Sequence, residues 1–179
     1  YNIDESKSKF INNVYENIVL EKNSKLKNLF IQGNKSDGFF HKFLKNKLSL
    51  NSDYSNLIFS SGLKFNKVDI ECDLIEENCI CNILSALFLK KNEHQEIKTL
   101  VNHLAPNCKS NQKVKNVLSS ESKGVYQGKI YVKDIAQKTN AYQLSKALLL
   151  DDNVEFNAKP ELEIYADDVK CSHGSASGS

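Results

Sequence analysis

The sequence has 179 residues, with no arginine and no methionine, and only 2 prolines and 7 glycines. Specific readout of nucleic-acid bases relies on arginine forks and on clustered basic surface. A chain without arginine and with a formal net charge of only +2 is therefore not expected to bind nucleic acid. The low content of glycine and proline also argues against a β-sandwich built from tight hairpins.

Long apolar runs are absent as well. No stretch approaches the roughly 20 apolar residues that a membrane-spanning helix needs, and residues 1–7 do not form a signal peptide. We therefore expect a cytoplasmic protein with no membrane partner. The 5 cysteines are odd in number and irregularly spaced, which predicts free thiols rather than a disulfide framework.

The remaining composition is that of a folded domain. Hydrophobic residues make up 40% of the chain and charged residues 26%, which is sufficient for one well-buried domain. Apolar and polar residues alternate over 68–74, 97–103 and 126–132, as in strands with one buried face. The segment 141–150 fits either a short helix or a strand. Strands thus dominate the predicted secondary structure.

A faint internal repeat favours one all-β architecture. Four segments share an outline in which a leucine is followed by three polar turn-forming residues and a resumed strand. Their leading leucines predict stacked rungs of about 25 residues, typical of a β-solenoid. The ends of a solenoid expose strand edges that must be capped or paired with another chain. The four segments are 20–26, 50–55, 74–80 and 150–156.

The segment 159–174 contains most of the candidate chemistry. Leu162, Ile164 and Ala166 fall on one face of a predicted strand that Pro160 begins. Four potential metal ligands follow within seven positions, and soft thiolate and borderline imidazole suit iron–sulfur chemistry. A thiolate and an imidazole two positions apart point the same way from an extended backbone. The four potential ligands are Asp167, Asp168, Cys171 and His173.

Each of these residues also has a purely structural interpretation. The segment around Cys171 and His173 could be a polar turn whose cysteine is incidental. Asp167 and Asp168 could hold iron, or could close a rung by accepting backbone hydrogen bonds. From the residues alone these alternatives stay open.

The other cysteines and one histidine are assigned to the core. Cys72, Cys79 and Cys81 lie in apolar alternations, where cysteine behaves as a small hydrophobe. His103 is in phase with its apolar neighbours and is expected to be buried. Cys108 follows a proline in a turn, and its role is left open.

Four blocks in one order carry a family resemblance that covers nearly the whole chain. They are His103-Leu-Ala-Pro-Asn-Cys-Lys-Ser110, Gly124-Val-Tyr-Gln-Gly-Lys-Ile130, Ala136-Gln-Lys-Thr-Asn-Ala-Tyr-Gln143 and Lys159-Pro-Glu-Leu-Glu-Ile-Tyr-Ala-Asp-Asp-Val-Lys-Cys-Ser-His-Gly174. The chain resembles the SufB/SufD core family of the SUF iron–sulfur cluster assembly system, and its Cys-Ser-His-Gly segment is more similar to the SufD branch. Asn140 and Glu96 depart from the family pattern, which has aspartate at both places.

The resemblance implies a right-handed parallel β-helix, with a lead-in at 1–9, the core at 10–174 and a small-residue tail at 175–179. Helical regions would flank this core in the intact protein. It also implies a non-catalytic scaffold subunit that pairs with SufB. Cys171 and His173 would contact a transient iron–sulfur cluster at that interface. The SufC ATPase would bind only through the missing C-terminal helical domain, and the fragment alone could form a homodimer.

Two other functions remain as alternatives. One is a purely structural solenoid that braces SufB and has no metal contact of its own. The other is a β-helix enzyme acting on polysaccharide, which would need acidic and aromatic residues along one face; Glu161, Glu163, Tyr165 and Asp167 are a thin basis for it. The sequence contains no Ser-His-Asp order, phosphate loop or HExxH motif, so we expect no enzyme.

Overall fold

The computed structural model describes residues 9–33 and 36–179, so the predicted lead-in at 1–9 lies outside the described residues except for Lys9. The described part consists of β-strands and contains no helix. The strands are β1 (Ile11–Leu20), β2 (Lys25–Gln32), β3 (Ser36–Leu48), β4 (Asp53–Ser60), β5 (Leu63–Leu74), β6 (Ile80–Leu89), β7 (His94–His103), β8 (Lys109–Leu118), β9 (Lys123–Val132), β10 (Thr139–Leu149), β11 (Glu155–Ile164) and β12 (Val169–Gly178).

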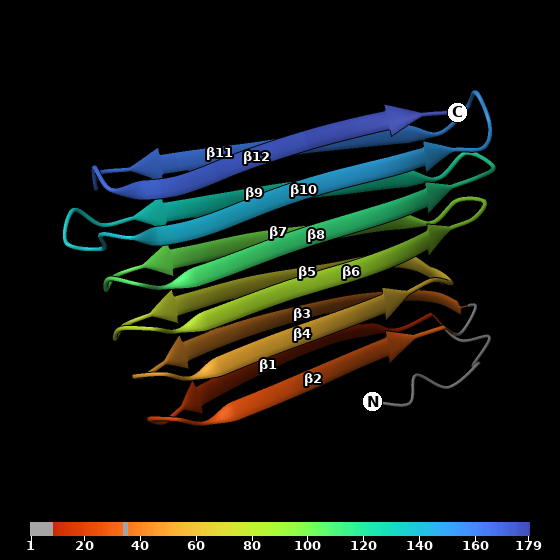
Figure 1. The fold of residues 1–179 in the computed structure, drawn as a ribbon. Helices are drawn as coiled ribbons and strands as arrows, with labels where there is room; N and C mark the ends of the chain where they lie inside the picture. Colours follow the sequence, from red (N-terminus) through yellow and green to blue (C-terminus); the bar gives the residue numbers. More distant parts are fainter. Residues whose placement is uncertain (1–8, 34–35) are drawn as a thin grey trace.

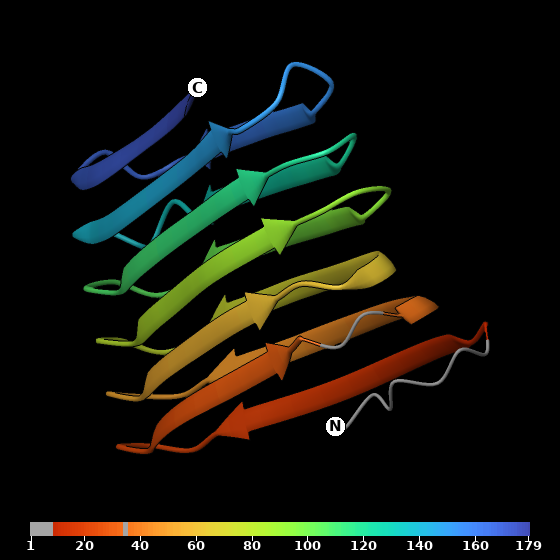
Figure 2. The ribbon, with the colours of Figure 1, turned by 90° about the vertical axis from the view of Figure 1, so that its right-hand side faces the viewer.

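The strands form two parallel sheets that face each other (Figure 1). The odd sheet has the order β1-β3-β5-β7-β9-β11, and the even sheet has the order β12-β10-β8-β6-β4-β2. One odd strand and the even strand that follows it make one rung, and about six rungs stack along the axis (Figure 2). The predicted all-β parallel solenoid is confirmed.

The predicted strand positions also agree with the structure. The alternating segments 68–74, 97–103 and 126–132 lie within β5, β7 and β9. The segment 141–150, which fitted a helix or a strand, belongs almost entirely to β10. The tail assigned to 175–179 includes the last four residues of β12, which pair with β10.

The repeat was interpreted correctly for three segments and wrongly for the fourth. The segments 20–26, 50–55 and 74–80 all lie where an odd strand turns into an even strand, an edge that we call the odd-to-even edge. The segment at 150–156 connects β10 to β11, on the opposite edge. In-register partners are 26 residues apart for Leu48 and Leu74, but 32 apart for Val132 and Ile164. The period is thus longer and less regular than the predicted 25 residues.

Asparagine shapes the odd-to-even edge. Asn23, Asn51, Asn78 and Asn107 take left-handed backbone angles, with φ between 56° and 60°. Asparagine adopts this region more easily than other non-glycine residues, which explains how the chain turns with so few glycines. The side-chain amide of Asn51 donates to Asn23 at 3.0 Å, and that of Asn78 donates to Asn51 at 3.1 Å. These residues therefore form a hydrogen-bonded ladder along the edge.

The interior contains buried polar side chains beside the apolar ones, and it includes the residues that were assigned to the core. Cys72, Cys79, Cys81 and His103 are fully buried, as predicted, and the cysteines are free thiols. The Nε2 atom of His103 lies 2.8 Å from the hydroxyl of Ser110. Burial lowers the pKa of His103 to about 4, so its imidazole is neutral near pH 7.

Pro160 lies in the middle of β11 and not at the start of the strand, as the sequence had suggested. Its position in the sheet explains why it is tolerated. Within the described residues β11 pairs with β9 alone. Glu155 and Tyr165 donate their backbone N–H groups towards the preceding rung, so alternation along the strand places the nitrogen of Pro160 on the free side. A proline there removes no hydrogen bond from the sheet.

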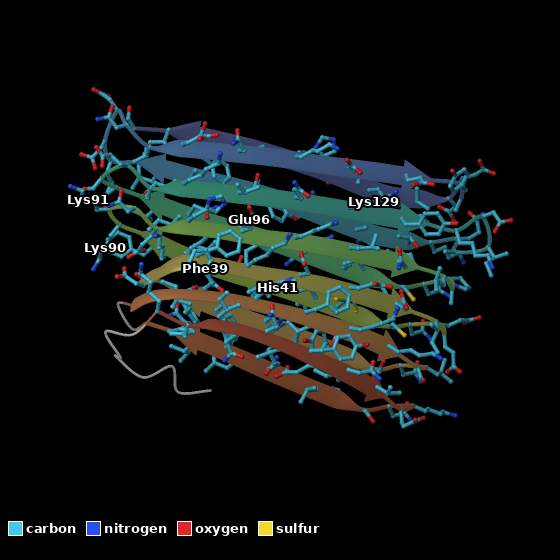
Figure 3. The ribbon with its side chains drawn as sticks, turned by 180° about the vertical axis from the view of Figure 1, so that it is seen from behind. Phe39, His41, Lys90, Lys91, Glu96 and Lys129 are labelled. Carbon is cyan, nitrogen blue, oxygen red and sulfur yellow. The ribbon has the colours of Figure 1, made fainter. Side chains whose placement is uncertain are left out.

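Ion pairs cover the outer face of the odd sheet, which Figure 3 shows with His41, Glu96 and Lys129 labelled. His41 lies 2.8 Å from Asp69 on the next rung, and Lys67 lies 3.6 Å from Glu96. Exposed pairs of this kind each contribute little to stability. The fold is therefore maintained mainly by the buried columns and the backbone ladders.

The asparagine ladder predicts different effects for two substitutions. Asn51→Ala should lower the free energy of unfolding by about 1–2 kcal/mol more than Asn51→Gly, because alanine is strained at positive φ and glycine is not. Urea-induced unfolding of both variants measures this difference. Equal losses would show that the side-chain ladder, and not the backbone conformation, makes asparagine necessary here.

The burial of His103 predicts a pH-dependent stability. Between pH 6.5 and about 4 the unfolded chain binds a proton that folded His103 does not. Stability should therefore decrease as the pH falls through this window, by on the order of 3 kcal/mol, and should not change on this account above it. His103→Gln should flatten that slope relative to the wild type in urea titrations at several pH values. An unchanged slope would contradict the assignment.

Candidate functional site

Cys171 and His173 lie within β12, the even strand of the last rung. The sequence had placed them after the predicted strand, close to small residues. The structure instead ends the preceding strand at Ile164 and turns over 165–168. Both residues therefore have the fixed spacing of a paired strand.

The register of β12 on β10 shows which way their side chains point. Cys171 pairs with Ala141, and His173 pairs with Gln143. Ala141 is 1% exposed and Gln143 is fully buried, so both belong to the inward-facing columns of the even sheet. Residues in register in a parallel sheet share a face. Cys171 and His173 hence continue two core columns. Their strand, β12, is the one that leads to the C-terminus (Figure 1).

Their burial differs from that of the columns beneath them. His173 is exposed and Cys171 is half-buried, because β12 is the outermost strand of the even sheet among the described residues. Cys171 packs against the small apolar cluster that includes Ala141. This burial raises the pKa of the Cys171 thiol, so a metal ion would bind it with release of a proton.

Asp167 and Asp168 occupy the turn before β12, and both are exposed. The carbonyl of Asp167 accepts a hydrogen bond from Val169, and that of Asp168 accepts one from Lys138 at 2.6 Å. The backbone N–H of Asp168 donates to the side chain of Gln137 at 2.9 Å. Over residues 9–33 and 36–179, no three histidine, cysteine or acidic side chains are close enough to hold a metal ion. Metal binding here would therefore need ligands from elsewhere.

Gln143 is a residue near this pair that the sequence did not single out. Its side-chain nitrogen donates to the carbonyl of Gly128 at 3.1 Å, which fixes the orientation of the amide. Its Oε1 atom is buried and has no hydrogen-bond partner. Gln143 is the in-register neighbour of His173 in the same column, so its amide belongs to the core directly under the imidazole position. Only the strand register could have identified it.

The interior remains polar beneath Gln143. The hydroxyl of Tyr126 lies 3.3 Å from Thr99 and 3.4 Å from Gln112, and all three residues are buried. Gly128 is required here, because a Cβ atom at this position would collide with Tyr126 and with the amide of Gln143. A buried polar network thus lies under the exposed pair.

The acidic residues of β11 do not form the arrangement that a glycoside hydrolase requires. Glu161 pairs with Lys159, and Glu163 pairs with Lys129 and accepts a hydrogen bond from Tyr165. Their lysine partners lower the pKa of both carboxyl groups. A general acid needs a raised pKa instead.

No helix in the described ranges is long and apolar enough to cross a membrane.

Comparison with known proteins identifies the family. The family model described as "SUF system FeS cluster assembly, SufBD core domain" matches residues 1–179. The iron–sulfur cluster assembly protein SufD of Escherichia coli is 36% identical over 143 residues, which is 77% of this chain and 33% of that protein. Protein ABCI7, chloroplastic, of Arabidopsis thaliana is 30% identical over 162 residues, or 89% of this chain and 34% of that protein.

A SufBD family protein of Synechocystis is 28% identical over 165 residues, which is 92% of this chain and 36% of that protein. The chain thus spans about a third of the length of these relatives. Together, the solenoid and the match along its whole length show that this chain belongs to the SufBD core domain family of the SUF iron–sulfur cluster assembly system.

Proposed function

We propose that this chain is the core of a non-catalytic scaffold subunit that pairs with SufB, in a complex that also contains SufC. Its cargo is a nascent iron–sulfur cluster at the interface, and Cys171 and His173 are the residues that contact it. SufC would bind outside this chain, through a C-terminal helical domain. The expected location is the cytoplasm.

One observation supports this proposal above the others. Cys171 and His173 continue two inward-facing core columns, yet the position of β12 leaves them accessible. Thiolate and imidazole are ligands suited to iron–sulfur chemistry. A pair of soft ligands on a paired strand is held more rigidly than on a loop, which favours a defined approach to the cluster.

The edge of β12 offers a way for the partner to supply the missing ligands. Two donors cannot complete the coordination of an iron ion, and the described residues contain no larger group. A partner strand that added to this edge would bring its own side chains opposite Cys171 and His173. The proposed site is therefore shared, and assembly of the complex would precede loading.

A second function is supported by the packing of Cys171. Its contact with the apolar cluster and its raised pKa also fit a structural cysteine. In that case the chain would brace SufB and would have no contact with the cluster. Asp167 and Asp168 would then only shape the turn.

Substitution of the pair distinguishes these functions. In the full-length protein, co-purified anaerobically with SufB and SufC, a Cys171→Ser/His173→Ala variant should form the complex but contain several-fold less iron and sulfide. Iron and acid-labile sulfide analysis measures the loss. Ser172→Ala is the matched control, because Ser172 lies between the two residues and its side chain points to the other face. Equal loading in all three proteins would favour the structural brace.

Gln143 provides a test of how His173 is oriented. Gln143→Leu removes the oxygen below the imidazole and preserves most of the side-chain volume. If that oxygen fixes the imidazole, iron affinity should fall roughly 10-fold or more, as for other residues that orient metal ligands. Iron titration of the anaerobic complex measures the affinity. Gln143→Glu retains an oxygen and should restore part of the binding; wild-type affinity in Gln143→Leu would assign Gln143 to the core alone.

A further inference from the structure

A second pair of sulfur atoms lies far from the site proposed above, inside the odd-to-even edge. Cys79 immediately precedes β6, and Cys108 immediately precedes β8. These strands pair in register, with Ile80 opposite Lys109. The two cysteines consequently occupy equivalent positions in consecutive rungs.

Their sulfur atoms contact the same backbone oxygen. The carbonyl of Glu76 lies 3.0 Å from the Cys79 sulfur and 3.3 Å from the Cys108 sulfur. The proximity of the two thiols lowers the pKa of Cys79 to about 7 and raises that of Cys108.

The column that contains these cysteines explains their structural role. Ser52 and Thr139 stand at the matching positions in the flanking rungs, and each hydroxyl donates to the carbonyl three residues earlier, at 2.6 and 2.8 Å. Cys79 makes the same contact with Glu76. A serine or threonine in place of Cys79 could therefore make the same turn hydrogen bond. Formation of the turn alone does not explain why two adjacent rungs have a thiol at this position.

The spacing of the rungs suits a covalent link. In-register neighbours in a sheet are about 4.7–4.9 Å apart, within the Cα separation of 4.4–6.8 Å that disulfides span. Both side chains are fully buried inside the same edge. No large backbone movement is needed.

We propose that Cys79 and Cys108 are a peroxide-sensitive dithiol whose oxidation links the third and fourth rungs by a disulfide. The Cys79 thiolate attacks one oxygen of hydrogen peroxide, which forms a sulfenic acid and releases hydroxide. Hydroxide takes up the proton lost from Cys79. The Cys108 sulfur then displaces the sulfenic oxygen as water, so two thiols and one peroxide give one disulfide and two waters.

A neighbouring pair provides an internal control. Cys72 and Cys81 are also fully buried, and the neighbouring Cys81 contributes to the raised pKa of Cys72. They come from the two facing sheets, however, and burial raises the pKa of Cys72. Because the thiolate is the form that reacts, peroxide should oxidise Cys79 and Cys108 first.

Peptide mapping under non-reducing conditions tests the proposal. The full-length protein would carry Cys171→Ser, so that the accessible thiol does not react. After treatment with dilute peroxide, tryptic peptides 68–90 and 99–109 should appear as one linked species, which a reductant separates. The link should be lost in Cys79→Ser, which preserves the turn contact with Glu76, and in Cys108→Ser, but retained in Cys81→Ser.

Thermal unfolding provides a second measurement. Oxidation should raise the melting temperature by roughly 5–10 °C in the protein with both cysteines, since the link closes a loop of some 30 residues. Oxidation should leave the melting temperature of Cys79→Ser unchanged. The proposal is overturned if no linked peptide forms, if Cys79 is oxidised only to sulfinic acid, or if the link joins Cys72 to Cys81 instead.

Discussion

The in-register pairing of parallel strands is the constraint on which the rest of this structure depends. Each rung satisfies its backbone groups by bonding to the rungs on either side, because strands within one rung belong to different sheets. Side chains at matching positions therefore form continuous columns. The asparagine ladder, the buried cysteines and the candidate site are three such columns, observed at the edge, in the middle and at the end of the stack.

The inward-facing columns become accessible to solvent at the outermost described strand of the even sheet. Ala141 and Gln143 are packed on both sides, whereas Cys171 and His173 occupy the same columns with one side open. The fold thus positions the two potential ligands without any specialised loop. It also places a polar interior beneath them. Gln143 is the residue in register with His173, and its buried side-chain oxygen has no hydrogen-bond partner among the described residues.

The sequence was sufficient to predict the class of fold and the positions and buried faces of individual strands. Alternation over 68–74 or 126–132 depends only on which face is buried, and this is a local property. The family blocks added the solenoid type. Relations between rungs were harder to predict, because they depend on how many residues each connection uses. Leu150 was assigned to the wrong edge for this reason, and Pro160 to the wrong place in its strand.

The same limit applies to the candidate site. Cys171 and His173 could be chosen from their chemistry and spacing, but their position within a strand required a knowledge of where β11 ends. Gln143 and the pairing of Cys79 with Cys108 could not be found at all without the register, since their partners lie some 30 residues away along the chain.

Pro160 has a consequence for how such stacks can grow. A solenoid that ends in two open strands could polymerise, with each molecule adding to the next as rungs do within one chain. The free side of β11 lacks one hydrogen-bond donor, whereas β12 contains no proline. A strand that paired with β12 would meet a backbone N–H donor at every pairing position, whereas a strand that paired with β11 would find none at Pro160. Any strand that paired with this side of β11 would therefore leave one of its carbonyl groups unpaired opposite Pro160.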